Sequence, residues 1–215
     1  DAGDEVDVRR AELAYPDNTI ARHFIENRLR LDLYRGNLRV GGRLLYFRPA
    51  EGDQVQYGQQ NESRFDKRYL EATFDWFKLR AGHYSDLWGH GLVLSLFENR
   101  DLYFDSELDG IRAEVDVGPF IVTGLRGNSA PGFLVKEADI TGAHVGSLIG
   151  GSGLGFSYAF IDSGYYSEAN VTGIDWRIAR GIFTLYGERA WKQTTLQSSK
   201  TNGHATYVGL VVSKW

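Results

Sequence analysis

The side chains best suited to acid–base or metal chemistry are five histidines: His23, His83, His90, His144 and His204. None belongs to a His-Glu-x-x-His pair or to a recognisable nucleophile motif. A serine–histidine pair on the outer wall of a sheet would suit a lipid-ester hydrolase. His144 lies near Ser147, but residues i and i+3 of a strand face opposite ways. His204 and Thr206 share a face but lack a third partner and an oxyanion loop. We therefore expect polar roles for the histidines and no enzyme activity.

Two further motifs could bind a ligand, but each is a weak signal. Acidic side chains that could hold Ca²⁺ crowd one segment: Asp101, Asp105, Glu107 and Asp109. They lack EF-hand spacing, so a solvated loop is the better interpretation. Residues 150–155 contain a nucleotide-like glycine pattern, but no strand–helix unit surrounds it. The chain has no cysteine, which excludes thiolate sites. The sequence thus predicts no cofactor and no firm metal site.

Charged side chains at every second position are the stronger signal. In residues 28–33 the leucines point one way and the charges the other, and residues 112–117 repeat this pattern. If the charged face lines a water-filled interior, the candidate lumen and selectivity residues are Arg28, Arg30, Asp32, Arg39, Arg43, Lys78, Arg80, Arg112, Glu114, Asp116, Asp175, Arg177 and Glu188. Mixed charge can form a transverse field that selects solutes. It can equally form a salt-bridged plug that conducts nothing, and the sequence leaves both open.

Period-two alternation recurs along most of the chain and predicts strands. Short turns are expected at 35–37, 118–119, 150–151 and 180–181. The apolar phase switches at Trp76-Phe77, where we expect a β-bulge. The predicted strands are 6–15, 20–35, 38–48, 68–81, 89–98, 108–117, 119–127, 138–149, 152–162, 167–179, 181–193 and 203–215.

The length of these strands favours a membrane barrel over a soluble sandwich or solenoid. Many run for the roughly 9–11 residues that a strand needs to cross a bilayer. The mean hydropathy of −0.33 is too polar for a helical membrane protein. Aromatic residues such as Tyr34, Trp88 and Trp191 fall near strand ends, as in interfacial girdles. We predict an all-β fold: one transmembrane, antiparallel, up-and-down β-barrel domain over residues 1–215, with about 12 strands or as part of a larger barrel.

The remaining global features agree with an exported protein. A net charge of −4 gives no reason to expect nucleic acid as a partner. The chain begins at Asp1 and contains no methionine, as expected after removal of a signal peptide, although a shortened chain would begin in the same way. Residues 207–215 alternate and close on an aromatic residue, which resembles the terminal strand of many bacterial outer-membrane proteins.

One segment resembles known barrel families. It comprises Leu79–Tyr84, Trp88–Leu92, Glu98–Leu102 and Leu108–Arg112. The pattern resembles an uncharacterised family of outer-membrane proteins in Bacteroidota and, more weakly, the alginate-export type of porin. His83 and Tyr84 stand where the second family has Arg-Gln. These resemblances imply a bacterial outer-membrane barrel and fix no substrate.

Two functions follow as expectations. The first is a porin-like channel for small polar or charged solutes, with outer-membrane lipid around it. The second is a non-conducting structural or accessory subunit, with loops 48–67 and 98–108 as docking surfaces for other envelope proteins.

Overall fold

The computed structural model describes residues 2–15, 18–48, 62–99, 104–129, 138–164, 167–196 and 199–213. These residues form strands, turns and loops, and none of the described segments contains a helix long and apolar enough to cross a membrane. The chain forms two compact units, Asp1–Ala72 (unit 1) and Thr73–Trp215 (unit 2), and each is described separately.

Unit 1 is an antiparallel meander. Its strands are β1 (Ala2–Tyr15), β2 (Asn18–Arg35), β3 (Leu38–Arg48) and β4 (Glu62–Thr73). Each pairs with the next in the chain. The turn between β2 and β3 is tight because Gly36 adopts a φ of 57°, which L side chains rarely adopt. An irregularity between Arg43 and Leu44 shifts the register of β3 against β4.

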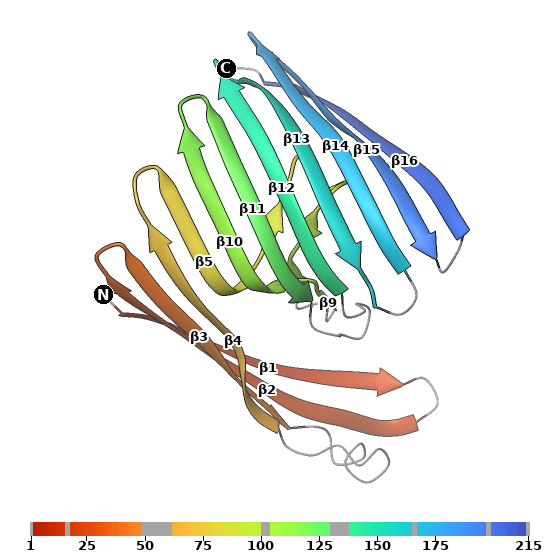
Figure 1. The fold of residues 1–215 in the computed structure, drawn as a ribbon. Coiled ribbons are helices and arrows are strands. Elements are labelled where there is room, and N and C mark those ends of the chain that lie inside the picture. The colour runs from red at the N-terminus through yellow and green to blue at the C-terminus, as the bar shows by residue number, and fades with distance from the viewer. Residues whose placement is uncertain are drawn as a thin grey trace. The chain divides into compact units, whose positions relative to one another are not determined.

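Unit 2 contains eight long strands that lie side by side in chain order (Figure 1). They are β5 (Phe77–Tyr84), β10 (Leu108–Val117), β11 (Phe120–Ser129), β12 (Ala138–Ile149), β13 (Ser152–Asp162), β14 (Ser167–Arg180), β15 (Phe183–Leu196) and β16 (Ser199–Val212). Glycines with positive φ at Gly118, Gly150 and Gly181 form the short hairpin turns. These turns confirm the sequence-based prediction, because left-handed backbone selects glycine locally.

Two predicted strands are wrong. Residues 68–81 are not one bulged strand: β4 ends at Thr73, and a turn closed by the Phe74 N–H to Phe77 O bond (2.8 Å) precedes β5. Residues 89–98 do not form a long strand. They belong to the β5–β10 loop (residues 85–107), whose short strands are β6 (Asp86–Leu87), β7 (Ser95–Leu96), β8 (Glu98–Asn99) and β9 (Phe104–Asp105). The two errors offset each other in the strand count.

The two faces of the unit 2 sheet differ in chemistry. We call the face that carries the β5–β10 loop the loop face and the opposite one the outer face. The outer face is apolar and exposed, for example at Phe156 (53%), Val208 (59%) and Leu210 (60%). Side chains alternate between the faces along every strand. The sheet therefore separates a large apolar surface from a face that is partly charged.

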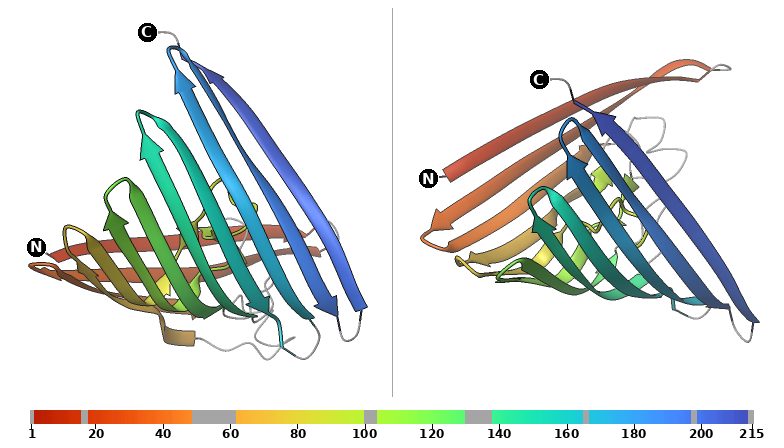
Figure 2. Two further views of the ribbon diagram at one scale, coloured as in Figure 1. Left: turned by 45° about the horizontal axis from the view of Figure 1, so that its top comes forward. Right: turned by 90° about the horizontal axis from the view of Figure 1, so that it is seen from above.

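The core of unit 2 lies between the loop and the loop face. The β6–β9 segment lies against one side of the sheet in both views of Figure 2. Trp88, Val93, Leu94 and Leu96 of the loop are buried against sheet residues that include Leu108. Burial of such a side chain contributes roughly 1.5–3 kcal/mol. The loop is thus a packed part of the fold.

Candidate functional site

One buried carboxylate holds the β5–β10 loop on the sheet. Glu188 of β15 is 1% exposed, and its oxygens accept three backbone N–H groups of the loop. Oε2 accepts from His90 at 2.6 Å and from Leu92 at 3.2 Å, and Oε1 accepts from Val93 at 3.2 Å. Hydrogen bonds to charged groups contribute roughly 1.5–3 kcal/mol each. Glu188 therefore acts as the anchor of the loop.

Small residues of the loop face make room for the large side chains of the loop. Trp88 is 2% exposed and stacks on His144, with 5.9 Å between ring centroids. Its indole lies over Gly142, where a Cβ would come within 2.7 Å of the ring. Val93 lies against Gly173 in the same way. The fit is steric and couples the loop to β12 and β14.

A Gly-His step brings the loop backbone close to two carboxylates. Gly89 adopts a φ of 56°, and a Cβ there would lie 2.9 Å from the Asp175 side chain and 3.0 Å from Glu188 Oε2. Only glycine tolerates both this positive φ and the lack of space for a Cβ. The next residue, His90, packs its ring against Tyr186 (4.9 Å between centroids) and Tyr207 (5.2 Å).

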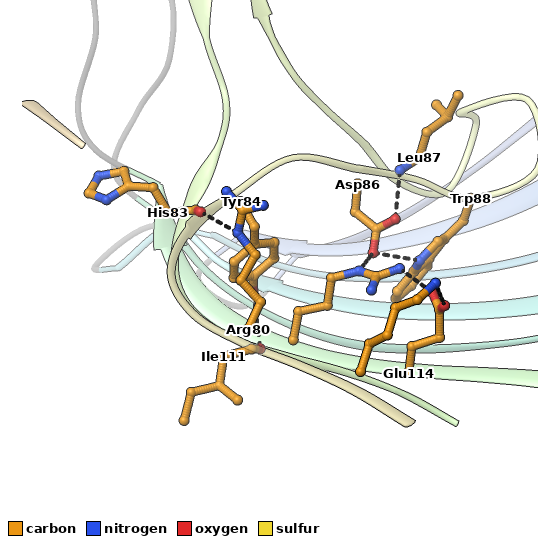
Figure 3. A network of polar contacts seen from close by, with 10 residues as sticks. Arg80, His83, Tyr84, Asp86, Leu87, Trp88, Ile111 and Glu114 are labelled. Carbon is orange, nitrogen blue, oxygen red and sulfur yellow. Dashed lines mark hydrogen bonds and ion pairs between the residues drawn. The ribbon is translucent and has the colours of Figure 1, made fainter. Parts of the chain in front are cut away.

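A chain of ion pairs joins the start of the loop to the sheet (Figure 3). Arg112 of β10 donates from Nε to Asp86 Oδ2 at 2.7 Å and from a terminal nitrogen to Glu114 at 2.7 Å. Lys78 Nζ of β5 donates to Glu114 at 3.0 Å. Trp88 Nε1 also donates to Asp86, at 3.3 Å. Positive and negative side chains thus alternate and compensate one another along this network.

A hollow of about 370 Å³ lies between the loop and the sheet. Residues 86–90 form one side of it, and strands β10 to β14 form the other. Its charged and imidazole-bearing lining includes Asp86, Arg112, Glu114, His144, Asp175 and Arg177. Such a lining is suited to small polar solutes, because donors and acceptors of both signs converge on one volume.

The candidate interior residues of unit 2 all lie on the loop face. They are Lys78, Arg80, Arg112, Glu114, Asp116, Asp175, Arg177 and Glu188. Lys78, Arg112 and Glu114 come together in the ion-pair network. Arg80 instead donates to the His83 carbonyl at 2.9 Å, and Asp116 is exposed. The shared face follows from strict period-two alternation.

The candidate residues of unit 1 also share a face, and they are ion-paired. They are Arg28, Arg30, Asp32, Arg39 and Arg43. Asp32 is 9% exposed and accepts from Arg39 at 3.0 Å and from the Tyr69 hydroxyl. Arg43 pairs with Asp66. The positive and negative charges of this cluster compensate one another, as in a salt-bridged wall.

The acidic segment is divided by the structure. Asp105 and Glu107 lie with Glu98 in one half-buried group within the loop. Asp109 lies apart from that group, on β10, with an oxygen 4.0 Å from His83 Nδ1. Asp101 lies outside the described residues. The Ca²⁺ candidate set is therefore not one site.

None of the histidine side chains that the structure describes forms an exposed pair with a serine, and the side chain of His23 lies outside the described ones. His144 meets Ser157 rather than Ser147: Nδ1 lies 2.8 Å from the Ser157 hydroxyl, across the β12–β13 ladder. Ser157 is 1% exposed beneath the docked loop. His204 lies opposite Trp191 on β15. The pair therefore lies on the loop face, under the loop, and not on the outer face of the sheet.

Sequence reasoning missed the residues that seat the loop, above all Asp86, Trp88 and His90. The interpretation of Trp88 as a girdle residue is wrong, because its ring is buried in the core. A usable signal was present. Gly89 and Gly91 both adopt positive φ, and such closely spaced glycines interrupt a regular strand.

Residues 12–153 match the family of unknown function DUF6029. The chain belongs to this family. DUF6029 fits the expectation of an uncharacterised family. No curated protein matches the sequence.

Solved structures identify the fold of this DUF6029 chain as that of outer-membrane porins. OpdL of Pseudomonas aeruginosa matches with a TM-score of 0.57 at 11% identity, over 97% of this chain and 59% of that one. OpdK of the same organism, an outer-membrane protein, gives 0.56 at 11% identity, over 98% and 61%. A BenF-like porin from Pseudomonas fluorescens gives 0.54 at 10% identity, over 98% and 64%. The chain thus spans about three fifths of the length of these proteins. At this identity the likeness concerns the fold, which is a transmembrane β-barrel.

Proposed function

We propose that this chain forms a channel, or part of one, for small polar or charged solutes in the bacterial outer membrane. The observation that carries the proposal is the infolded β5–β10 loop. It narrows the space beside the sheet yet leaves a hollow of about 370 Å³ lined by charged side chains. The loop face is then the wall of an aqueous path, and the loop is its constriction.

The apolar outer face supports a membrane setting. Leu154 and Phe156 of β13 are 63% and 53% exposed, and Leu185 of β15, on the other side of β14, is 40% exposed. Large contiguous apolar patches on a soluble monomer mark interaction surfaces. Lipid acyl chains are the partner that this surface fits, as on the lipid-facing band of a barrel.

Planar-bilayer recording tests the channel directly. The purified protein, reconstituted in lipid, should give discrete conductance steps. A variant with residues 87–106 replaced by a short Gly-Ser linker should give larger steps, because the constriction is gone. Silence from both proteins would refute the channel.

A second function is favoured by the ion-paired cluster of unit 1 and the apolar core beneath the loop. Both fill space with compensated or apolar groups, as a closed structural subunit of an envelope complex would. Under this alternative the intact protein is silent and co-purifies with stoichiometric partners. The docking role of loops 48–67 and 98–108, of which residues 49–61 and 100–103 lie outside the described residues, and a Bacteroidota origin remain predictions.

A further inference from the structure

The hollow beneath the β5–β10 loop contains two charged side chains that form no ion pair with any described residue. Asp175 lines it, and its Oδ2 is buried without a hydrogen-bond partner in the described structure. Arg177 lines it too, is exposed, and makes no hydrogen bond or ion pair with any described residue. An unpaired carboxylate that is partly desolvated favours a cation beside it.

The other charged groups in the hollow have partners. Asp86 and Glu114 both accept from Arg112, and Lys78 also neutralises Glu114. Glu188, which lies opposite Asp175 across the β14–β15 ladder and outside the lining of the hollow, accepts from three backbone donors of the loop. Asp175 and Arg177 of β14 are therefore the anion and the cation of the hollow with which a solute can pair.

The spacing of these two residues limits the length of a ligand that contacts both. Asp175 and Arg177 are two residues apart on the same face of one strand, about 6.8 Å between Cα atoms. An extended dipeptide reaches roughly the same distance between its ends. A volume of about 370 Å³ is also small for a ligand pocket, which typically measures about 300–1,000 Å³.

We propose that the hollow binds small zwitterionic solutes of the dipeptide class. The solute ammonium lies at Asp175, and the solute carboxylate pairs with Arg177, whose planar fork matches a carboxylate. The inference rests on the proposed function in that the solute would bind on its way through the channel.

Three probes and crossed variants test the site. The probes are glycylglycine, N-acetylglycylglycine (no ammonium) and glycylglycinamide (no carboxylate), each titrated as a blocker of single-channel current and by calorimetry in detergent. For the unmodified protein we expect glycylglycine to bind about tenfold more tightly than either analogue, because each analogue loses one charged hydrogen bond.

The variants should lose one preference each. Asp175→Asn should bind glycylglycine and its N-acetyl analogue alike, yet still discriminate against the amide. Arg177→Gln should show the reverse. Glu168→Gln and Arg180→Gln remove the same charges from the same strand outside the hollow and should change neither preference. Equal binding of all three probes, or loss of both preferences in either variant, would overturn the proposal.

Failure of the channel and failure of the site give different results. Conductance without probe discrimination refutes the zwitterion site and leaves the channel standing. A silent bilayer combined with the expected calorimetric preferences refutes the channel and supports the site.

Discussion

Glu188→Gln is the sharpest test of the loop anchor. Gln keeps the shape of Glu but offers one oxygen in place of two. With that oxygen at the Oε2 position, the bonds from His90 and Leu92 survive without their charge, and an NH₂ group faces the Val93 N–H. The loss of charge costs roughly 1 kcal/mol for each surviving bond, and the orphaned N–H costs about 1–3 kcal/mol. The docked loop should therefore be destabilised by about 3–5 kcal/mol.

Hydrogen exchange read by mass spectrometry measures this cost in detergent. Local opening governs exchange, and each 1.4 kcal/mol is a factor of ten, so amides of residues 88–94 should exchange at least about 100-fold faster in the variant. Peptides from β12 and β13 should keep their protection. Glu168→Gln, an exposed acid on β14, is the matched control. A change below about threefold in the loop would refute the anchor, since the apolar contacts alone would then hold the loop.

Three further substitutions test the packing of the loop on the sheet, the lipid contact of the outer face and the ion-pair network. Gly142→Ala should lower the unfolding temperature in a thermal melt and cost about 1–3 kcal/mol through overpacking, whereas Gly124→Ala, which meets nothing within 4 Å, should be neutral. Val208→Arg on the outer face should cost about 2–4 kcal/mol in denaturant titrations in lipid vesicles, whereas Asn202→Arg near the strand end should cost about 0–1 kcal/mol; equal costs would contradict a bilayer around this face. Arg112→Gln should raise cation over anion permeability about fivefold, the effect of roughly 1 kcal/mol of charge in water, in reversal-potential measurements; an unchanged ratio would place the network outside the conducting path.

Local sequence patterns predicted the hairpin turns of the unit 2 sheet and the face on which each side chain lies. The turns at Gly118, Gly150 and Gly181 follow from left-handed backbone, which glycine adopts at little cost. The common face of Lys78 and Glu114 follows from alternation, and their pairing in the β5–β10 ladder places them together. Such features depend on near neighbours in the chain, so the sequence is sufficient for them.

Long-range contacts explain what the sequence did not reveal. Residues 92–96 are apolar enough to resemble a strand, and only Glu188, 95 residues beyond Val93, shows that this segment docks as a loop. The partner of His144 depends on the β12–β13 register, which places Ser157 opposite it. Period-two alternation identifies a face but not the residue across the ladder.

The large sequence separation between Glu188 and the loop amides also bears on the order in which contacts form during folding. The loop is synthesised before β15, so its anchor and much of its seat do not exist until the later strands have paired. Contacts of such high sequence separation form late, since closing the intervening chain carries an entropic cost. We therefore expect the strands of the sheet to pair first and the β5–β10 loop to dock last. A chain truncated before β15 lacks Glu188 and therefore lacks the carboxylate that accepts the three loop amides.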